Sequence, residues 1–566
     1  MISQLKRKIG QLASDTILRK WLIGRALLRL KGPAVFTPHQ PPYIQHLLPL
    51  VIESPEWDIS PPELAKAPPI TPMALELLGV PLVFDQNKLV DFLDPSSDDI
   101  EFELAQHRFA WIPLIADLDA AWLNALWRTW RGQFMNTSGW AWHPYTTAER
   151  AVNLLDAAGR CGIPDALDVF TEDLATHARE ISQHLEYFGD HDTSNHLANN
   201  GRGLFRLGCA LRMPHLRALG YEILCCEAER IILEGGSLRE GSTHYHMLYV
   251  RNYIDVWLAA HRHGNAQEAE HLRGIAARLL AVAKRLVLPG RLPLIGDISP
   301  DCPPAFLAGI EIGACAWTET LSYDEQQLVK TLAKETLPAT SEHLQRDGWV
   351  RADFGSWSML TSAPSTGWPL MPGHAHQDIG SAEIHFDGQP LFVDPGRGAY
   401  GETGEAAQYM SAAVHSGLRI NHQDPYPSNK PYYSDAFRQT VAGPAWSEIS
   451  ANNVTITHGG YRRLGIEFVQ RAWFFDGNNL TITDYIKGRG QHVAERALVT
   501  PHDVKIKDDK VIINNLFIMH ASDARPRITP VKIWEAYGRS RQGSRIVFEN
   551  TVSSSWDGTI KIEAQR

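Results

Sequence analysis

The pattern of hydrophobic and polar residues changes once along the chain, near residue 345. Between about residues 101 and 340, apolar residues recur at the spacing of amphipathic helices. The helices predicted from this spacing cover residues 150–159, 166–187, 196–211, 216–233, 245–263 and 267–286. Short loops such as Gly235-Gly236-Ser237 separate them and favour antiparallel neighbours. A block of helical hairpins of similar length is typical of a layered helical toroid or solenoid.

Beyond residue 345 the pattern becomes that of strands. Short runs rich in β-branched and aromatic residues alternate with turn pairs such as Asp387-Gly388 and Asp476-Gly477. The predicted strands cover residues 382–386, 391–393, 453–457, 468–475, 480–485, 511–513 and 559–562. Such a series predicts a large antiparallel β-sandwich. Helices followed by strands make an α+β chain of two separately layered domains, and the cleft between such domains is the natural place for a site.

The pattern divides the 566 residues into three parts. Residues 101–340 are the predicted (α/α) toroid, and residues 345–566 are the predicted antiparallel β-sandwich. Residues 1–100 are an N-terminal extension in which a basic helix precedes a Pro-rich, irregular segment. The basic helix could make peripheral contact with a membrane or a partner, or it could pack on the body of the protein. Its apolar stretch, residues 21–28, is interrupted by Arg25 and is too short for a signal peptide or a membrane span. A cytoplasmic location is therefore the default, with a periplasmic or membrane-peripheral one left open.

Charge and cysteine content narrow the functional classes. The formal net charge is −10, which argues against nucleic-acid binding, because nucleic-acid-binding proteins carry a basic face. Any site for an anionic polymer must then be a locally basic region on a protein whose net charge is negative. The six cysteines lack paired metal-binding spacing. We interpret them as buried thiols without a disulfide framework.

Two helix starts concentrate residues with binding or catalytic chemistry. Asn195-His196 opens one predicted helix, with Asn199 one turn on. These side chains could bind a carboxylate, or they could only cap the helix. At the second start, Tyr245 stands between two histidines, close behind Glu240. Taken alone, that second segment is equally compatible with a buried tyrosine that has a bonded hydroxyl.

A third segment begins with His374 and His376. If these residues lie on a strand, their side chains point the same way. Two imidazoles so placed, with Asp394 and a third histidine, suit a metal such as zinc. The same residues could instead form a hydrogen-bonded network without a metal.

In combination, these segments resemble the heparinase II/III-like polysaccharide lyases over nearly the whole chain. The segments that carry the resemblance are, in order, Trp142-His143-Pro144-Tyr145 with residues 149–153, Asn195-His196-Leu197 with Asn200, residues 240–246, residues 374–394 leading to Gly398-Ala399-Tyr400, His415, and Tyr537-Gly538. The chain departs from the family pattern in two places. Ser416-Gly417 stands where the family usually has Asn-Thr, and Gln377 stands where a small residue is common.

The resemblance implies β-elimination on an anionic polysaccharide that contains a uronate. The C5 proton of a uronate is a very weak acid, so the neighbouring carboxylate must be neutralised to stabilise the enolate-like transition state. By resemblance, Asn195 and His196 neutralise the carboxylate. Tyr245 is the acid, or both acid and base in a syn-elimination, and His374 is the base in an anti-elimination.

The resemblance also implies a metal site and substrate contacts. His376, Asp394 and His415 match the positions of a structural zinc site that orients the segment of His374. No organic cofactor is expected. The predicted substrate-binding residues are Arg150, Asn199, Glu240, Arg397 and Tyr400.

Three other functional classes compete with a lyase: a glycoside hydrolase, a glycan-binding protein, and a metal-dependent scaffold with no role toward sugars. A glycoside hydrolase on a helical toroid needs two carboxylates facing each other across a cleft, and Glu240 is a candidate for one of them. A non-catalytic glycan-binding protein of an exopolysaccharide system fits the basic N-terminus and the absence of an export signal. The presence of Asn195, His196, Tyr245 and His374 together argues against the binding protein. The sequence assigns neither the polymer nor an oligomeric state.

Overall fold

The computed structural model describes residues 23, 27, 38–49, 54–57, 73–84, 93, 99–115, 120–189, 193–367, 373–401, 403–427, 443–553 and 555–565. Apart from residues 23 and 27, the predicted basic N-terminal helix lies outside the described residues, as does most of the Pro-rich segment. The described part of that segment contains a 3₁₀ helix, η1 (Pro42–Leu47), and a hairpin of β1 (Met73–Leu77) and β2 (Val80–Phe84). The hairpin turn meets the sheet part of the chain, where a Cβ on Gly538 would lie 1.8 Å from the carbonyl oxygen of Leu78.

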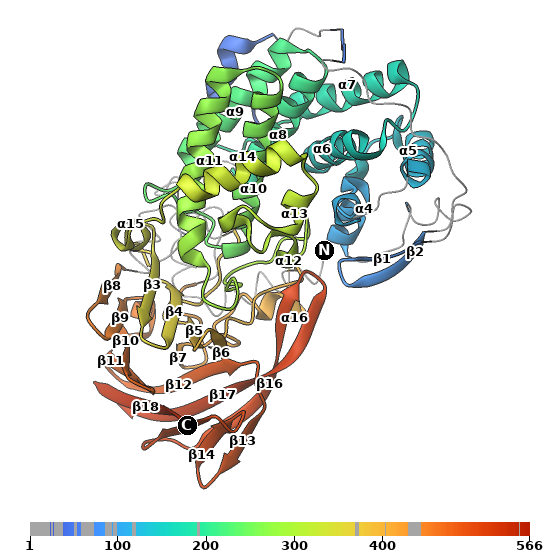
Figure 1. Ribbon diagram of the computed structural model, residues 1–566. Coiled ribbons are helices and arrows are strands. Elements are labelled where there is room, and N and C mark those ends of the chain that lie inside the picture. The colour runs from blue at the N-terminus through green and yellow to red at the C-terminus, as the bar shows by residue number, and fades with distance from the viewer. Residues whose placement is uncertain are drawn as a thin grey trace.

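Helices dominate the described chain between residues 100 and 346 (Figure 1). The longer ones are α4 (Ile100–Arg108), α5 (Ala120–Phe134), α6 (Pro144–Cys161), α7 (Leu167–Gln183), α8 (Asn195–Ala210), α9 (Pro214–Ile231), α10 (Thr243–Arg262), α11 (Ala266–Leu286) and α14 (Tyr323–Glu335). The shorter ones are α12 (Pro304–Leu307), α13 (Ala316–Glu319) and α15 (Ser341–Arg346). All six predicted helices are confirmed, with ends that differ from the predicted ones by a few residues.

The predicted catalytic residues Asn195 and Tyr245 lie at the starts of two helices, α8 and α10. The Ser194 hydroxyl accepts a hydrogen bond from the backbone N–H of His196 and so caps α8. The Ser242 hydroxyl accepts from the backbone N–H of Tyr245, at 3.2 Å, and caps α10. Because serine supplies both caps, the side chains of Asn195 and Tyr245 are free to make other contacts.

Glycines allow α8 and α9 to pack at backbone distance. A Cβ added to Gly220 of α9 would lie 2.4 Å from the backbone nitrogen of Phe205 in α8. A Cβ on Gly208 of α8 would lie 2.4 Å from the backbone nitrogen of Arg217 in α9. Only a residue without a side chain fits at such crossings.

We therefore expect Gly220→Ala to lower the free energy of unfolding by about 1–3 kcal/mol, because the clash with backbone exceeds the gain in helix propensity. Gly274→Ala is the matched control, since Gly274 is an exposed glycine within α11 that has nothing within 4 Å of its added Cβ. The control should be neutral or slightly stabilising. Chemical denaturation of both variants tests this, and equal stability of the two would contradict the close packing of α8 on α9.

The chain from residue 349 onward consists mainly of antiparallel strands. One sheet has eight strands in the order β13-β14-β15-β18-β11-β10-β9-β8, and two further sheets have four strands each, in the orders β16-β17-β12-β7 and β3-β4-β5-β6. The strands are β3 (Trp349–Phe354), β4 (Trp357–Ser362), β5 (Ala382–Phe386), β6 (Gln389–Phe392), β7 (Leu418–Ile420), β8 (Ala445–Ile449), β9 (Asn453–His458), β10 (Ile466–Asp476), β11 (Asn479–Gly488), β12 (Gln491–Thr500), β13 (Val504–Lys507), β14 (Lys510–Ile513), β15 (Phe517–Ala521), β16 (Pro526–Ala536), β17 (Arg539–Ser553) and β18 (Trp556–Ala564). A short helix, α16 (Gly404–Gln408), lies between β6 and β7. All seven predicted strands are confirmed.

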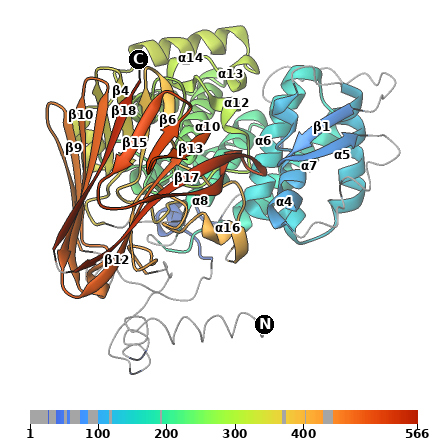
Figure 2. The same cartoon turned by 90° about the horizontal axis from the view of Figure 1, so that it is seen from below.

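Alternation along the strands builds the core of the sheet part. In β11, Leu480 and Ile482 are fully buried, while the residues between and beside them are partly or fully exposed. These side chains pack with apolar residues of β3, β4 and β5 in one cluster. Seen from below, the sheets lie to one side of α4, α5 and α7 (Figure 2). The chain thus has a helical part followed by a part made of antiparallel sheets.

Two other expectations bear on the described residues. None of the six cysteines, which all belong to the described residues, forms a disulfide, as predicted, but only Cys209, Cys302 and Cys315 are buried. The predicted burial is wrong for the other three, which are partly exposed. Within the described ranges, each helix is too short or too polar to cross a lipid bilayer.

Candidate active site

The candidate site lies where a loop of the helical part meets two segments of the sheet part. Asp297 lies in the loop between α11 and α12, and its backbone N–H donates to the carbonyl oxygen of His374 at 2.9 Å. The next N–H, that of Ile298, donates to the carbonyl oxygen of Arg397 at 2.9 Å. Gly296 has a φ of +84°, and a Cβ there would lie 2.8 Å from the His374 carbonyl oxygen. Glycine at this position therefore lets the two backbones meet and places Asp297 beside His374.

The Asp297 carboxylate connects three side chains. It lies 3.1 Å from His374 Nδ1 and 2.8 Å from His376 Nε2, and it accepts from Arg397 Nη1 at 3.0 and 3.1 Å. Burial raises the pKa of Asp297, but the two histidine hydrogen bonds and the Arg397 charge outweigh burial and hold the pKa well below its usual range. An ionised carboxylate only accepts, so both histidines must present an N–H to it. In their neutral forms, His374 keeps its lone pair on Nε2 and His376 keeps its lone pair on Nδ1.

His374 and Tyr245 form the centre of the site. Their rings are stacked, with centroids 3.7 Å apart and an interplanar angle of 13°. The Tyr245 hydroxyl lies 2.7 Å from the Tyr400 hydroxyl, which itself donates to the carbonyl oxygen of Ile298 at 3.2 Å. Because the Tyr400 hydroxyl uses its only hydrogen for Ile298, the Tyr245 hydroxyl is the donor in the hydrogen bond between the two tyrosines. Burial, and then the nearby Asp301 carboxylate, raise the pKa of Tyr245 well above its usual value. Tyr245 is therefore protonated at neutral pH and better suited to act as an acid than as a base.

Asn195 lies against His374 from the side of the helical part. Its side-chain nitrogen Nδ2 donates to Glu240 Oε2 at 3.0 Å and lies 3.1 Å from His374 Nε2. Its backbone N–H donates to Glu240 Oε1 at 2.8 Å. Glu240 is fully buried, so it orients Asn195 and does not face a ligand. Glu240 therefore cannot be one of the two facing carboxylates that a glycoside hydrolase needs.

His196 follows Asn195 on α8 and completes the set of four predicted catalytic residues. Its side chain is 40% exposed, the most open of the four, and its ring lies 4.6 Å from the ring of Tyr145. Burial lowers the pKa of His196, but the Glu186 carboxylate beside it outweighs burial, so the pKa is raised. The structure thus brings Tyr245, His374 and Asn195 into direct contact, with His196 next to them in the chain.

The predicted metal-binding residues also come together. Ligand atoms of His376, Asp394 and His415 lie within 4.8 Å of one another, and all three residues are buried. His415 Nε2 lies 3.0 Å from the carbonyl oxygen of Tyr409, to which it must donate, while its Nδ1 lies 2.9 Å from Asp394 Oδ2. His376 Nδ1 is buried without a hydrogen-bond partner among the described residues. Two nitrogen lone pairs and a carboxylate oxygen therefore converge, and this donor set suits a zinc ion.

The prediction that His374 and His376 share a face of a strand is wrong. Residues 373–381 form a loop between β4 and β5. The two rings nevertheless converge because both donate to the carboxylate of Asp297. A tertiary hydrogen bond, and not strand periodicity, sets their common direction.

Arg150 does not belong to the site. It is fully buried inside the helical part, where its guanidinium lies 4.0 Å from the ring centroid of Trp130. It donates to the carbonyl oxygens of His107 and Ala141 at 2.9 and 2.7 Å, and to a nitrogen of His177 at 2.9 Å. The predicted substrate contact is therefore corrected: with no exposed surface, Arg150 holds helices together.

The other predicted substrate-binding residues differ in their access to a ligand. The Arg397 guanidinium is buried and donates to Asp297 and to the carbonyl oxygens of Ala406 and Gly401. Asn199 is buried and donates to the carbonyl oxygen of Tyr145 at 3.3 Å. Like Glu240, Arg397 and Asn199 are used within the protein. Tyr400 is half-buried and lies at the centre of the site, beside Tyr245.

Sequence reasoning missed two carboxylates. Asp297 follows the apolar pair Leu294-Ile295 and a glycine, and a charged residue in such a setting is a signal that could have found it. Glu186 lies in the loop after α7, and nothing in its local sequence distinguishes it from other glutamates. Asp297 contacts histidines 77 and 79 residues away, and Glu186 contacts His196 across the loop that joins α7 to α8, so only the fold reveals them.

The chain is similar to one family and to several solved structures. Residues 336–561 match the model of the family described as "Heparinase II/III-like, C-terminal". A structure titled "Crystal Structure of Heparinase III" matches with a TM-score of 0.60 and 15% identity, over 84% of this chain and 79% of that chain. A heparinase III gene product matches with a TM-score of 0.59 and 15% identity, over 85% and 83%. A mutant of the heparan sulfate lyase HepC from Pedobacter heparinus matches with a TM-score of 0.53 and 16% identity, over 85% and 79%. No curated protein matches the sequence. At these identities the structural likeness is one of fold.

Proposed function

From the match of residues 336–561 to the model of the heparinase II/III-like family, we propose that this chain is a polysaccharide lyase that cleaves a uronate-containing polysaccharide by β-elimination. The observation that carries the proposal is the contact of Tyr245, His374 and Asn195, three residues from different parts of the chain. They join an acid, a base and an amide at one point, which is the set that β-elimination needs. As part of this proposal, residues 101–340 are an (α/α) toroid and residues 345–566 a β-sandwich.

The reaction divides into three tasks for the side chains of the site. When substrate binds, the Asn195 N–H that faces His374 Nε2 turns to the uronate carboxylate, which frees the lone pair of His374. Asn195 and His196 together bind this carboxylate and stabilise the charge that develops on it. His374 Nε2 takes the C5 proton, and the electrons of that C–H bond form the double bond between C4 and C5. The bond from C4 to the linking oxygen breaks, and Tyr245 gives its hydroxyl proton to that oxygen. Proton exchange with solvent then restores both groups.

The assignment of acid and base follows from the two hydrogen-bond patterns. Asp297 holds the Nδ1–H of His374, so neutral His374 carries its lone pair on Nε2, as a base requires. Tyr245 has a pKa raised by burial and keeps its proton, as an acid requires. This pairing favours His374 over Tyr245 as the base.

A zinc ion held by His376, Asp394 and His415 is part of the proposal. Bound zinc would fix the loop that carries His374, through the hydrogen bonds of His376 and His374 to Asp297. The ion would serve structure and orientation, and each proton transfer would remain with the side chains.

We expect purified protein to contain zinc, and chelation to lower its melting temperature. Zinc present at about a thousand times its Kd would add about 4 kcal/mol to the free energy of unfolding. His415→Ala should bind no zinc at this site and should lose the response to chelator. His458→Ala, which removes another buried histidine of the sheet part, should keep both. Metal analysis and thermal denaturation measure this, and a wild-type protein free of zinc after growth in zinc-replete medium would contradict it.

Mass spectrometry of the products tests the proposed reaction against its main rival. A lyase leaves a fragment with an unsaturated uronate at its new end, and the summed product masses equal that of the substrate. A glycoside hydrolase adds one water for each bond cleaved. Products that carry the added water would overturn the proposal.

A further inference from the structure

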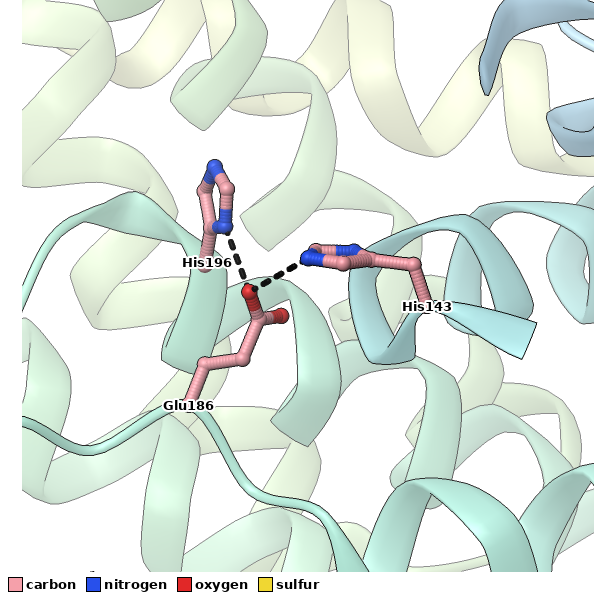
Figure 3. Close-up of side chains that lie close together, drawn as sticks. All are labelled: His143, Glu186 and His196. Carbon is pink, nitrogen blue, oxygen red and sulfur yellow. Dashed lines mark hydrogen bonds and ion pairs between the residues drawn. The ribbon is translucent and has the colours of Figure 1, made fainter. Parts of the chain in front are cut away.

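His196 lies next to the carboxylate of Glu186, which has no role in the sequence predictions or in the proposed mechanism. Glu186 Oε1 lies 2.7 Å from His196 Nδ1 and 3.5 Å from His143 Nε2. In Figure 3 the carboxylate of Glu186 lies between the two imidazole rings. Glu186 comes from the loop after α7, His143 directly precedes α6, and His196 is in the first turn of α8. Three elements thus bring these side chains together.

The Glu186 carboxylate is fixed in place by Asn200, one turn after His196 on α8. Asn200 Nδ2 donates to Glu186 Oε2 at 3.1 Å, and Asn200 Oδ1 accepts from the backbone N–H of Glu186 at 3.1 Å. The Glu186 side chain is only 7% exposed. One oxygen of the carboxylate is therefore held by Asn200, and the other faces His196 Nδ1.

This arrangement determines what the other nitrogen of His196 can do. Nδ1 must present its hydrogen to Glu186, because an ionised carboxylate only accepts. Nε2 points away from Glu186 (Figure 3) and makes no hydrogen bond to the other described residues. In neutral His196 this Nε2 would carry a lone pair, which repels a carboxylate ligand. Only the imidazolium form presents an N–H there, so a carboxylate ligand requires protonated His196.

The charges around His196 favour the imidazolium form. The titratable and charged groups that face it from the surrounding elements are Arg108, His143, Tyr145, Glu186, Glu240 and Asp301. Burial and the Arg108 charge lower the pKa of His196, whereas the carboxylates of Glu186, Glu240 and Asp301 raise it, and the outcome is a raised pKa. Burial lowers the pKa of His143, so that ring is neutral near neutral pH. Burial raises the pKa of Tyr145, which is also neutral.

We infer that Glu186 is a positioning residue that keeps His196 in its imidazolium form, with Nε2–H free to bind the substrate carboxylate. The inference rests on the proposed function, since it concerns how that same site neutralises a uronate. Glu186 touches no substrate itself. It acts through His196, by charge and by orientation.

The first test compares the pH dependence of kcat/KM in wild type, Glu186→Gln and Glu180→Gln. Glutamine keeps the shape and an acceptor oxygen but removes the charge. Glu180 is the matched control, because Glu180 and Glu186 both line one cavity of about 720 Å³, and Glu180 pairs with His184 instead of His196. Wild-type activity should fall as rising pH deprotonates His196. In Glu186→Gln that fall should begin at least about one pH unit lower, with a loss of about tenfold or more above the shifted pKa and little loss below it.

A structural role for Glu186 would lower activity by the same factor at every pH, and this result would overturn the inference. Glu180→Gln should keep the wild-type profile. A shift in that control equal to the shift in Glu186→Gln would also count against a specific role for Glu186.

The second test needs no substrate. Exchange of the imidazole C2 hydrogen, followed by mass spectrometry of the peptide that contains His196, gives the pKa of this side chain. The pKa should lie above about 6.5 in wild type and fall in Glu186→Gln. If it falls while no polymer is cleaved, the inference about Glu186 stands and the proposed lyase activity fails. An unchanged pKa overturns the inference whatever the activity.

A divalent cation is the competing occupant of this cluster, since His143, Glu186 and His196 also have ligand atoms within 4.8 Å of one another. Metal analysis of the same variants separates the two cases. The inference expects equal metal content in wild type and Glu186→Gln. A stoichiometric ion that is lost with Glu186 would overturn it.

Discussion

Tyr245→Phe is expected to lower kcat on the order of 10²–10⁴-fold, because it removes the one proton that the proposed mechanism gives to the leaving oxygen. KM and stability should change little. The Tyr245 hydroxyl contacts the Tyr400 hydroxyl, which keeps its hydrogen bond to the carbonyl oxygen of Ile298. The phenyl ring can still stack on His374. Steady-state kinetics, with chemical denaturation alongside, measure both effects.

Tyr253→Phe is the matched control on the same helix. The hydroxyl of Tyr253 donates to the carbonyl oxygen of Leu224 at 2.8 Å and is buried away from the site. Its loss should cost about 1–2 kcal/mol of stability and leave kcat unchanged. If Tyr245→Phe keeps more than a tenth of the wild-type kcat, Tyr245 is not the acid.

Asp297→Asn is expected to have the second large effect, because it acts on stability and on catalysis together. Asparagine keeps one acceptor oxygen and places an amide N–H₂ against donors from His374, His376 and Arg397. The buried charge of Arg397 then loses its partner, at a cost of about 3–5 kcal/mol. His374 and His376 lose the group that orients them, which should lower both kcat and zinc affinity about 10–100-fold.

A second buried ion pair provides the control for stability alone. Asp484 accepts from Arg471 Nε at 2.7 Å and from Nη2 at 2.9 Å, within the sheet part of the chain. Asp484→Asn should destabilise the protein to a similar degree while kcat and zinc content stay at wild-type values. Comparison at a temperature where both variants are folded isolates the catalytic effect. A kcat of Asp297→Asn equal to that of Asp484→Asn would show that Asp297 does not orient the site.

Much of the fold follows from periodicity. Every helix predicted between residues 101 and 340, and every predicted strand, is present because amphipathic spacing of three to four residues, or strict alternation, leaves one face to bury. The site follows from sequence only where residues cluster locally, as Asn195-His196 and His374 with His376 do. The resemblance to a family supplied the roles of those residues.

The rest depends on contacts between distant segments. Glu240 appears in the sequence as a substrate contact, but a fully buried carboxylate that accepts from Asn195 twice can only orient it. Arg150 looks like a carboxylate-binding arginine, yet the aromatic side chains around it bury it completely. Burial of a long polar side chain depends on how helices pack, and no local pattern encodes it.

The most direct test of the account measures the ultraviolet absorbance of a 4,5-unsaturated uronate while purified, zinc-loaded protein acts on a panel of uronate polymers. The account predicts a rise in absorbance with at least one polymer, and no rise with Tyr245→Phe or His374→Ala. A polymer that is shortened without any rise would contradict β-elimination in favour of hydrolysis. A polymer that binds tightly but is not shortened would indicate a glycan-binding protein instead.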